Sequence, residues 1–284
     1  MATFYNQATL SYNDTTTNSN IVTGELVEVL TATKTAIPAN YRAGDRITYI
    51  VSIQNSGATA VTGVEISDNL GEYAFGNVTL VPLSYVDGSV RYYINGDITA
   101  SPAVTAGPPL EISGITIPAN GNALIIYQAD VNAFAPLETA STITNTASIT
   151  GAGLVNAVMA TATVTADDSA NLSITKSLSP ETVTENGELT YTFVIQNTGN
   201  TAVTVADNAI VTDTFDPVLN PISVTFNGTA WTAPANYTYD TATGEFATVA
   251  GQITVPAATY TQDSVTGAWI TQPGVSTLKI TGTV

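Results

Sequence analysis

The chain contains neither cysteine nor histidine among its 284 residues. Without cysteine no disulfide can hold the fold together, and the redox compartment of the protein stays undetermined. Without histidine the commonest general base and metal ligand is missing, and nucleophilic triads built on histidine are excluded. These absences, with no convergent Ser/Asp/Glu motif, argue against an enzyme that acts on external substrates.

Basic residues are also scarce, since 6 Lys and Arg oppose 23 Asp and Glu and the formal net charge is −17. This acidity argues against nucleic acid or an anionic membrane as a partner. Only 10% of residues are charged, so the chain is not a solvated acidic tail. No run is long and apolar enough to span a membrane. We expect no membrane insertion, no small-molecule substrate and no cofactor.

The two halves of the chain repeat one strand pattern. Residues 34–57 and residues 176–199 align without gaps. In both copies apolar residues alternate with polar ones, which is the period of a half-buried strand, and Asn-Ser-Gly or Asn-Thr-Gly then supplies turn residues. The matching pairs are Lys34 and Lys176, Tyr49 and Tyr191, Gln54 and Gln196, Asn55 and Asn197, and Gly57 and Gly199.

No helical periodicity of useful length appears, and Thr, Val, Ala and Asn dominate the composition. Such a composition suits many short strands. The sequence therefore predicts an all-β protein of two tandem Ig-like β-sandwiches of Greek-key type. We expect an N-terminal donor hairpin in residues 1–29, a complete repeat 1 in residues 30–168, and repeat 2 in residues 169–284.

The first residues of the chain look like the closing hairpin of a domain. Residues 4–10 repeat the alternating pattern of residues 143–149, which lie late in repeat 1, and Asn6 takes the place of Asn145. Each segment is followed by a second strand that leads directly into the next repeat. The N-terminal hairpin therefore stands to repeat 1 as the closing hairpin of repeat 1 stands to repeat 2.

Repeat 2 is expected to lack such a hairpin, because its last residues, 278–284, match residues 123–131, the strand before the hairpin in repeat 1. A sandwich without its last hairpin exposes an apolar groove and unpaired strand edges. Each large side chain buried there would contribute roughly 1.5–3 kcal/mol, against a domain stability of about 5–15 kcal/mol. We expect a second subunit to complete repeat 2 by strand addition. The donor side chains would be Phe4, Ala8, Leu10, Val22 and Leu26.

Head-to-tail addition of this kind closes into rings or continues as an open filament. The alternative is that residues 1–29 form only an edge hairpin on repeat 1 or a loose leader. No signal-peptide pattern precedes Phe4, so the route of export stays open. We expect no metal site, although Asp/Asn clusters such as residues 167–168 leave calcium open without matching the EF-hand spacing.

Five polar side chains occupy positions where strand alternation predicts the core. At each of them the residues two positions before and two positions after are apolar. An isolated buried charge costs several kcal/mol, so we expect these groups to meet one another. A desolvated lysine loses its proton and becomes a nucleophile, and a buried protonated carboxyl group polarises an amide. The five residues are Lys34, Asp68, Asn145, Lys176 and Asp213.

Two alternatives stay open for this set. In the first alternative, the residues form a buried ion pair or a hydrogen-bonded cluster without any covalent bond between them. Lys34, which is flanked by Ala32 and Ala36, would instead extend its ammonium group to solvent.

The motifs of the repeat resemble a known class of domain. They are TK at residues 33–34, GDRITYIVSIQNSG at 44–57, VEISDNL at 64–70 and ITNTASIT at 143–150. This pattern resembles the conserved repeat domain of bacterial and archaeal surface proteins, and it is similar to the isopeptide-forming domains of Gram-positive pilins and adhesins. The resemblance implies an extracellular, Ig-like structural module without enzyme activity on external substrates.

The resemblance also implies roles for the polar residues. Lys34 and Asn145 would be joined by an isopeptide bond, with Asp68 as the proton shuttle. In repeat 2, Lys176 and Asp213 would take the corresponding roles, and Asn6 of the next subunit would supply the asparagine. Self-catalysed bond formation is then the only chemistry expected of the chain.

Together these observations predict a structural subunit of an extracellular filament, pilus-like or appendage-like, at a cell or spore surface. Its partners would be further copies of itself. The alternative is a monomeric surface stalk or adhesin module that presents a ligand-binding domain. A filament needs residues 1–29 for assembly, whereas a stalk behaves the same without them.

Overall fold

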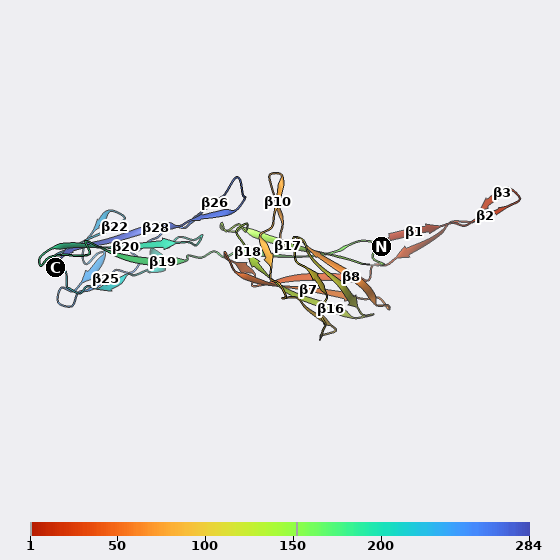
Figure 1. Cartoon of the computed structure of the whole chain (residues 1–284), viewed down its shortest axis with the longest axis horizontal. Helices are drawn as coiled ribbons and strands as arrows, with labels where there is room; N and C mark the ends of the chain where they lie inside the picture. The colour runs from red at the N-terminus through yellow and green to blue at the C-terminus, as the bar shows by residue number, and fades with distance from the viewer. Residues whose placement is uncertain (1, 152) are drawn as a thin grey trace. The chain divides into compact units, whose positions relative to one another are not determined.

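A computed structural model of the chain describes residues 2–151 and 153–284 (Figure 1). The described residues form β-strands and one short 3-10 helix, Val205–Asp207, so the predicted all-β fold is confirmed. The chain divides into unit 1, Met1–Ala135 with Thr142–Thr165, and unit 2, Pro136–Ser141 with Ala166–Val284. No helix in the described part of the chain has the length and hydrophobicity that crossing a membrane requires.

Unit 1 is a sandwich of two six-stranded sheets. The chain crosses between the sheets several times, as in an Ig-like topology, and places β7 and β16 in one sheet and β8 and β17 in the other. The first sheet has the order β13 (Asp97–Thr99), β12 (Arg91–Ile94), β16 (Asn122–Val131), β7 (Arg46–Asn55) and β5 (Leu30–Ile37), with β11 (Leu83–Tyr85) also paired to β16. The second has the order β14 (Ala103–Thr105), β15 (Leu110–Ile117), β8 (Val61–Asp68), β17 (Thr142–Thr150), β18 (Val158–Ala166) and β6 (Asn40–Tyr41). A small hairpin joins β9 (Tyr73–Phe75) to β10 (Val78–Leu80).

Alternating side chains build the core of unit 1, because successive residues of a strand face opposite sides of the sheet. Along β7 the side chains of Ile47, Tyr49 and Val51 are fully buried. The predicted closing hairpin forms β17 and β18, which pair along their length. Since β17 also pairs with β8, this hairpin completes the second sheet.

Unit 2 contains a five-stranded sheet and a three-stranded sheet. Apolar side chains from both sheets, among them Phe215, Phe246 and Leu278, form its core. The larger sheet has the order β19 (Leu172–Ser179), β20 (Glu188–Asn197), β28 (Gly274–Thr283), β22 (Ile222–Phe226) and β23 (Thr229–Trp231). The smaller has the order β21 (Thr212–Thr214), β25 (Glu245–Thr248) and β24 (Tyr237–Tyr239), and β26 (Thr259–Gln262) pairs with β27 (Trp269–Gln272).

The sequence repeat is also a structural repeat. Leu30 lies opposite Asn55 in unit 1, and Leu172 lies opposite Asn197 in unit 2. β28 pairs with β20 as β16 pairs with β7. The described residues of unit 2 contain no strands at the places of β17 and β18.

The N-terminal segment forms four strands where the sequence predicted two. β1 (Ala2–Asn6) pairs with β4 (Val22–Leu26), and β2 (Thr9–Tyr12) pairs with β3 (Thr15–Asn18). The pairing is interrupted at Gln7 and Ala8, which lie outside the strands. All five predicted donor side chains are exposed, and the four large ones retain 40–62% of their accessible surface.

The repeated asparagine of the turn motif holds each unit together. Asn55 is buried, and its Nδ2 donates to the carbonyl oxygens of Thr59 and Pro118 at 2.8 and 3.0 Å. Its Oδ1 accepts the N–H of Gly57 at 2.9 Å. Asn197 makes the same three kinds of hydrogen bond in unit 2. The motif therefore ties the end of one strand to the turn that follows it and to a distant loop.

Substitution Asn55→Ala is expected to lower the free energy of unfolding of unit 1 by roughly 2–4 kcal/mol, because it leaves buried backbone groups unpaired. Urea denaturation measures this change. The matched control is Gln54→Ala, which removes an exposed side chain from the same strand and is expected to stay within about 0.5 kcal/mol of the unchanged protein. Equal stability of the two variants would contradict the structural role of Asn55.

Candidate functional site

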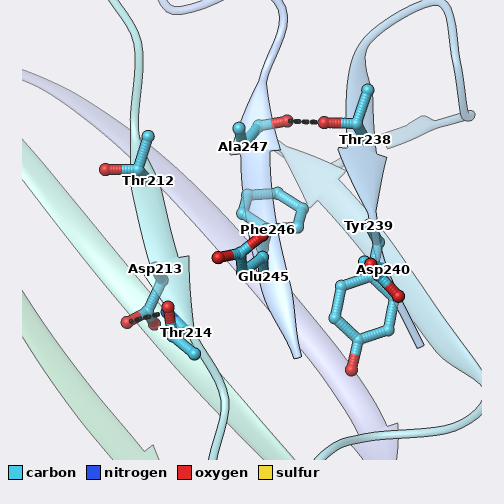
Figure 2. Close-up of a pocket in the computed structure, with 9 residues that line it drawn as sticks. All are labelled: Thr212, Asp213, Thr214, Thr238, Tyr239, Asp240, Glu245, Phe246 and Ala247. Atoms are coloured by element: carbon cyan, nitrogen blue, oxygen red, sulfur yellow. Dashed lines mark hydrogen bonds between the residues drawn. The ribbon is translucent and has the colours of Figure 1, made fainter. Parts of the chain in front are cut away.

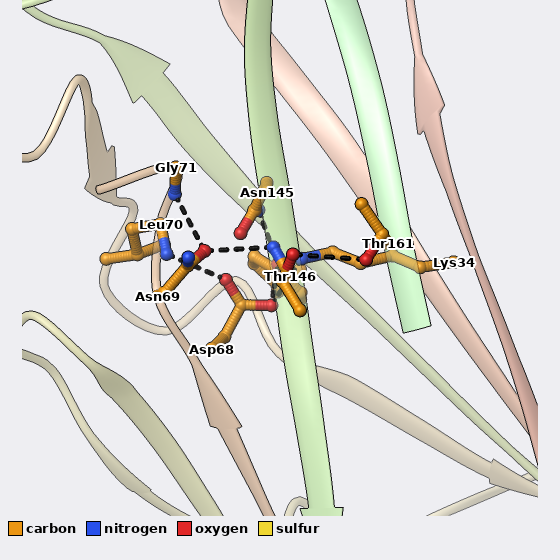
Figure 3. A network of polar contacts seen from close by, with 9 residues as sticks. Lys34, Asp68, Asn69, Leu70, Gly71, Asn145, Thr146 and Thr161 are labelled. Carbon is orange, nitrogen blue, oxygen red and sulfur yellow. Dashed lines mark hydrogen bonds and ion pairs between the residues drawn. The ribbon is translucent and has the colours of Figure 1, made fainter. Parts of the chain in front are cut away.

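Three of the predicted polar residues meet in the core of unit 1 (Figure 3). The Nζ atom of Lys34 on β5 lies 2.6 Å from Oδ2 of Asp68 on β8, and both side chains are fully excluded from solvent. The hydroxyl of Tyr127 on β16 donates to the same Oδ2 at 2.5 Å. Asn145 on β17 donates from Nδ2 to the oxygen of Tyr127 at 3.1 Å. The alternative in which Lys34 extends to solvent is therefore wrong.

Tyr127 was not among the residues predicted for this site. It alternates with apolar residues such as Ile125 and Ala129 along β16, so the pattern indicates only a core aromatic side chain. Its hydroxyl nevertheless joins Asp68 to Asn145. The one sequence signal for Tyr127 is a hydroxyl-bearing side chain at an inward position of a strand that neighbours the cluster.

The end of β8 is held firmly beside β17. The other carboxylate oxygen of Asp68 accepts the N–H of Leu70 at 3.1 Å. The side-chain oxygen of Asn69 accepts the backbone N–H groups of Thr146 at 2.9 Å and Gly71 at 3.0 Å (Figure 3). These bonds fix the carboxylate of Asp68 in the core and fasten the turn after it to the strand that carries Asn145.

Burial determines the protonation of this cluster. It lowers the pKa of Lys34 from 10.5 to about 8, because the attraction of Asp68 offsets only part of the desolvation of the ammonium group. Burial also raises the pKa values of Tyr49 and Tyr127 above the ordinary value of tyrosine. Lys34 is thus readily converted to the neutral amine near pH 8, while both tyrosine hydroxyls keep their protons.

Two atoms of the cluster have no hydrogen-bond partner among the described residues, the hydroxyl of Tyr49 and the side-chain oxygen of Asn145. The side-chain oxygen of Asn145 is buried and accepts no hydrogen bond. Leaving such an oxygen unpaired costs about 1–3 kcal/mol. The amide is therefore held with its oxygen free to accept a proton donor.

Unit 2 contains an incomplete version of the same cluster. Lys176 on β19 lies with Nζ 2.5 Å from Oδ2 of Asp213 on β21, and 4.5 Å from the centre of the Tyr191 ring. The Lys176 side chain is 40% exposed, whereas that of Lys34 is 0% exposed. Ile280 lies opposite Tyr191, which is the place of Tyr127 in unit 1, so this position offers no hydroxyl to the ion pair.

Among the described residues, no hydrogen bond links an asparagine of unit 2 to this ion pair, whereas Asn145 is linked to Asp68 through the hydroxyl of Tyr127. Asn6, the predicted partner, lies on β1 of the N-terminal hairpin, opposite Val22. The roles predicted for Asn6, Lys176 and Asp213 therefore stay predictions.

A sheet edge of unit 2 lies open beside the ion pair. In unit 1, β8 lies between β15 and β17, whereas β21 pairs only with β25 in residues 2–151 and 153–284. The inner face of β19 is uncovered as a result, since Leu172 is 44% exposed and its counterpart Leu30 only 5%. An apolar hollow of about 170 Å³ lies there. It is lined by Leu172, Ser173, Ile174, Ile195, Ala209, Ile210, Val211 and Ile253.

A second, wider hollow of about 520 Å³ runs along the three-stranded sheet (Figure 2). It follows β21 from Thr212 to Thr214, and Asp240 and Glu245 line it from the neighbouring strands. Open space therefore borders the strand with the free edge and reaches Asp213. In the described part of the chain, no three acidic side chains gather in a way that would hold a metal ion.

Solved structures with pilus and adhesin domains resemble this chain. The pilus backbone RrgB from Streptococcus pneumoniae matches with 11% identity and a TM-score of 0.35, over 86% of this chain and 55% of that one. The collagen-binding domain from a Staphylococcus aureus adhesin matches with 10% identity and a TM-score of 0.31, over 50% of this chain and 99% of that one. The collagen-binding subdomain of the Enterococcus faecalis surface protein ACE matches with 6% identity and a TM-score of 0.33, over 50% and 99%.

No family model matches the sequence, and no curated protein is similar to it. Pilus-backbone and adhesin domains are thus among the solved structures that the chain resembles, as the motifs of the repeat predicted. The superpositions are distant, and the chain covers 55% of the pilus backbone.

The pKa of Lys34 makes the stability of unit 1 depend on pH when the lysine is unreacted. Between about pH 8 and pH 10 the unfolded chain keeps this proton and the folded protein releases it, so stability rises with pH in that window. An Asn145→Ala variant, which cannot form an isopeptide bond, is expected to gain at most about 1.4 kcal/mol per pH unit there.

Chemical denaturation between pH 7 and pH 10 measures this slope. The control is the double variant Lys34→Met, Asn145→Ala, in which the rise in stability between pH 8 and pH 9 is expected to be lost. Closer to pH 10 the raised pKa values of Tyr49 and Tyr127 lower the stability of both variants alike. The same slope in both variants would show that Lys34 is not the group responsible.

Proposed function

We propose that the protein is a structural subunit of a surface filament, in which residues 2–26 of one subunit complete unit 2 of another. The observation that carries this proposal is the open edge of β21 beside the ion pair of Lys176 and Asp213. At the corresponding place in unit 1, β17 and β18 fill the sheet. The N-terminal hairpin repeats the sequence pattern of those two strands.

The contact between the hairpin of one subunit and unit 2 of another, called the joint here, would stabilise both partners. An isolated hairpin is marginally stable in water, and this one exposes Phe4 at 55% and Leu10 at 62%. The acceptor exposes Leu172 at 44% and Ile174 at 53%. Covering these side chains contributes roughly 1.5–3 kcal/mol for each one that becomes fully buried. The added strand also pairs the free backbone groups of β21.

The joint links two different surfaces, since the donor hairpin precedes unit 1 and the acceptor edge belongs to unit 2. Contacts of this heterologous kind propagate from one subunit to the next. They produce an open fibre unless the rotation between subunits closes a ring. The motifs of the repeat, which are those of surface proteins, favour a fibre at a cell surface.

The cluster in unit 1 supports an internal covalent lock. The neutral amine of Lys34 attacks the side-chain carbonyl carbon of Asn145, a bond from Nζ to Cγ forms, and the bond from Cγ to Nδ2 breaks. Asp68 takes a proton from the attacking amine and passes it to Nδ2 of Asn145, which then leaves as ammonia. The buried side-chain oxygen of Asn145 has no hydrogen-bond partner, so it is available to a proton donor during the reaction.

The same chemistry applies at the proposed joint. Lys176 would supply the amine, Asp213 the proton shuttle, and Asn6 of the incoming subunit the amide. Each joint of the filament would then be covalent. The reaction exchanges one amide for another and releases ammonia, so it balances without an oxidant, a reductant or a cofactor.

Deletion of residues 1–28 is expected to abolish fibre formation, because it removes the donor hairpin and leaves unit 2 without a partner. Negative-stain electron microscopy of the full-length chain beside the deletion variant measures the outcome. Fibres from the full-length chain alone support the proposal. Monodisperse particles in both samples would instead favour a monomeric stalk or adhesin module, and fibres in both would exclude assembly through this hairpin.

Bond formation is expected to lower the intact mass by one ammonia per bond. Asn145→Ala removes this loss from unit 1, whereas Asn6→Ala converts a ladder of multimers on a boiled denaturing gel into monomers. Lys279→Arg, which changes an exposed lysine of unit 2, is the control and should leave both readouts unchanged. An undiminished ladder from Asn6→Ala would contradict the joint bond.

A further inference from the structure

We infer that the joint has a single register, in which Ala8 of the incoming subunit lies opposite Asp213 and Leu10 lies opposite Val211. This inference rests on the proposed function and specifies its interface. It follows from unit 1, where Ala147 lies opposite Asp68 and Ile149 lies opposite Ile66.

The acceptor strands of the two units have the same phase. Leu110 of β15 lies opposite Asp68, and Phe246 of β25 lies opposite Asp213. Leu110 and Phe246 are both buried. Each aspartate also holds the lysine of the first strand of its own unit. β21 therefore presents its free edge to an incoming strand in the way that β8 presents the corresponding edge to β17.

The register places Leu10 at the apolar hollow of unit 2. Val211, its expected partner, is one of the residues that line this hollow of about 170 Å³. The counterpart of Leu10 in unit 1 is Ile149, which is fully buried. Leu10 is 62% exposed in the hairpin, so the joint would transfer it from water to an apolar site.

The register also places Asn6 at the ion pair of Lys176 and Asp213. The register requires residues 6–10 to form one continuous strand on assembly, across the interruption at Gln7 and Ala8. In such a strand the side chains of Asn6 and Ala8, two residues apart, face the same side. Because Ile280 replaces the bridging tyrosine of unit 1, the carboxamide of Asn6 is the group that would pair the remaining polar atoms of Lys176 and Asp213.

Asn6 is therefore the residue that selects the register. A slip of one residue would turn Tyr5, Gln7 and Thr9 inward and place Asn6 and Leu10 in water. A slip of two residues would put Ala8 in the position of Asn6 and bury the charges of the ion pair without a polar partner, which is costly. Only the stated register gives both the hollow and the ion pair a matching side chain.

Disulfide trapping tests the register, and the absence of cysteine from the chain makes the result unambiguous. Thr9 and Thr212 are expected to be directly opposed, like Ser148 and Ser67 in unit 1. The full chain carrying Thr9→Cys and Thr212→Cys should form an inter-subunit disulfide on mild oxidation, because opposed Cα atoms lie within disulfide reach. Proteolysis without reductant and mass spectrometry identify the linked peptides.

The matched control is the chain carrying Thr9→Cys and Thr214→Cys, which moves the acceptor cysteine two positions along the same exposed face of β21. Its thiols are expected to stay free. A disulfide in this pair and none in the first would overturn the register while leaving strand complementation intact. Failure of the unaltered chain to assemble would instead overturn the proposed function.

A second comparison does not depend on disulfide formation. Leu10→Asp is expected to raise the protein concentration needed for assembly by at least about tenfold, because it brings a charge to the apolar hollow. Ser11→Asp introduces the same charge on the outward face and should assemble as the unaltered chain does. Both residues are exposed in the hairpin before assembly. The reverse ranking of the two variants in a sedimentation assay would overturn the placement of Leu10.

Discussion

The structure depends on an ion pair that is placed inside an apolar sandwich. A buried lysine and carboxylate cost several kcal/mol in desolvation, and this cost is offset only where further polar groups complete the pair. In unit 1 this desolvation cost is offset, because the hydroxyl of Tyr127 and the backbone N–H of Leu70 donate hydrogen bonds to Asp68. β17 covers the cluster and brings Asn145 to it. The burial of the ion pair in unit 1 thus depends on the strand that covers it.

The same constraint gives unit 2 its character. Lys176 and Asp213 form the ion pair, and aromatic rings lie beneath it, but the strand that should cover it is not among the described residues of that unit. The lysine therefore remains 40% exposed, and an apolar hollow and a free strand edge lie next to it. In the proposed filament one segment, residues 2–26 of another subunit, would cover the lysine, fill the hollow and pair with the free strand edge. In that proposal, pairing of this edge with the N-terminal hairpin would direct association into ordered growth.

Much of the fold could be predicted because alternation of apolar residues is a local signal. The strand that contains Tyr49 and Val51 has alternate side chains buried, as its sequence indicates. The placement of Lys34 and Asp68 on inward faces follows from the same signal. The four-stranded form of the N-terminal hairpin could not be predicted, because the interruption at Gln7 and Ala8 arises from backbone pairing and not from side-chain pattern. Tyr127 was missed since an inward tyrosine in a strand is indistinguishable from an ordinary core aromatic residue.

The sequence by itself determined the repeat, the strand faces and the types of residue at the candidate site, because each of these is written in residues close together along the chain. The tertiary structure decided which of them meet. Lys34, Asp68 and Asn145 are distant in sequence and lie on three strands, and only the pairing of those strands shows that a tyrosine joins two of them and that one amide oxygen lacks a partner. The free edge of β21 is likewise a property of the sheet, because whether a strand has a neighbour depends on pairing between distant segments.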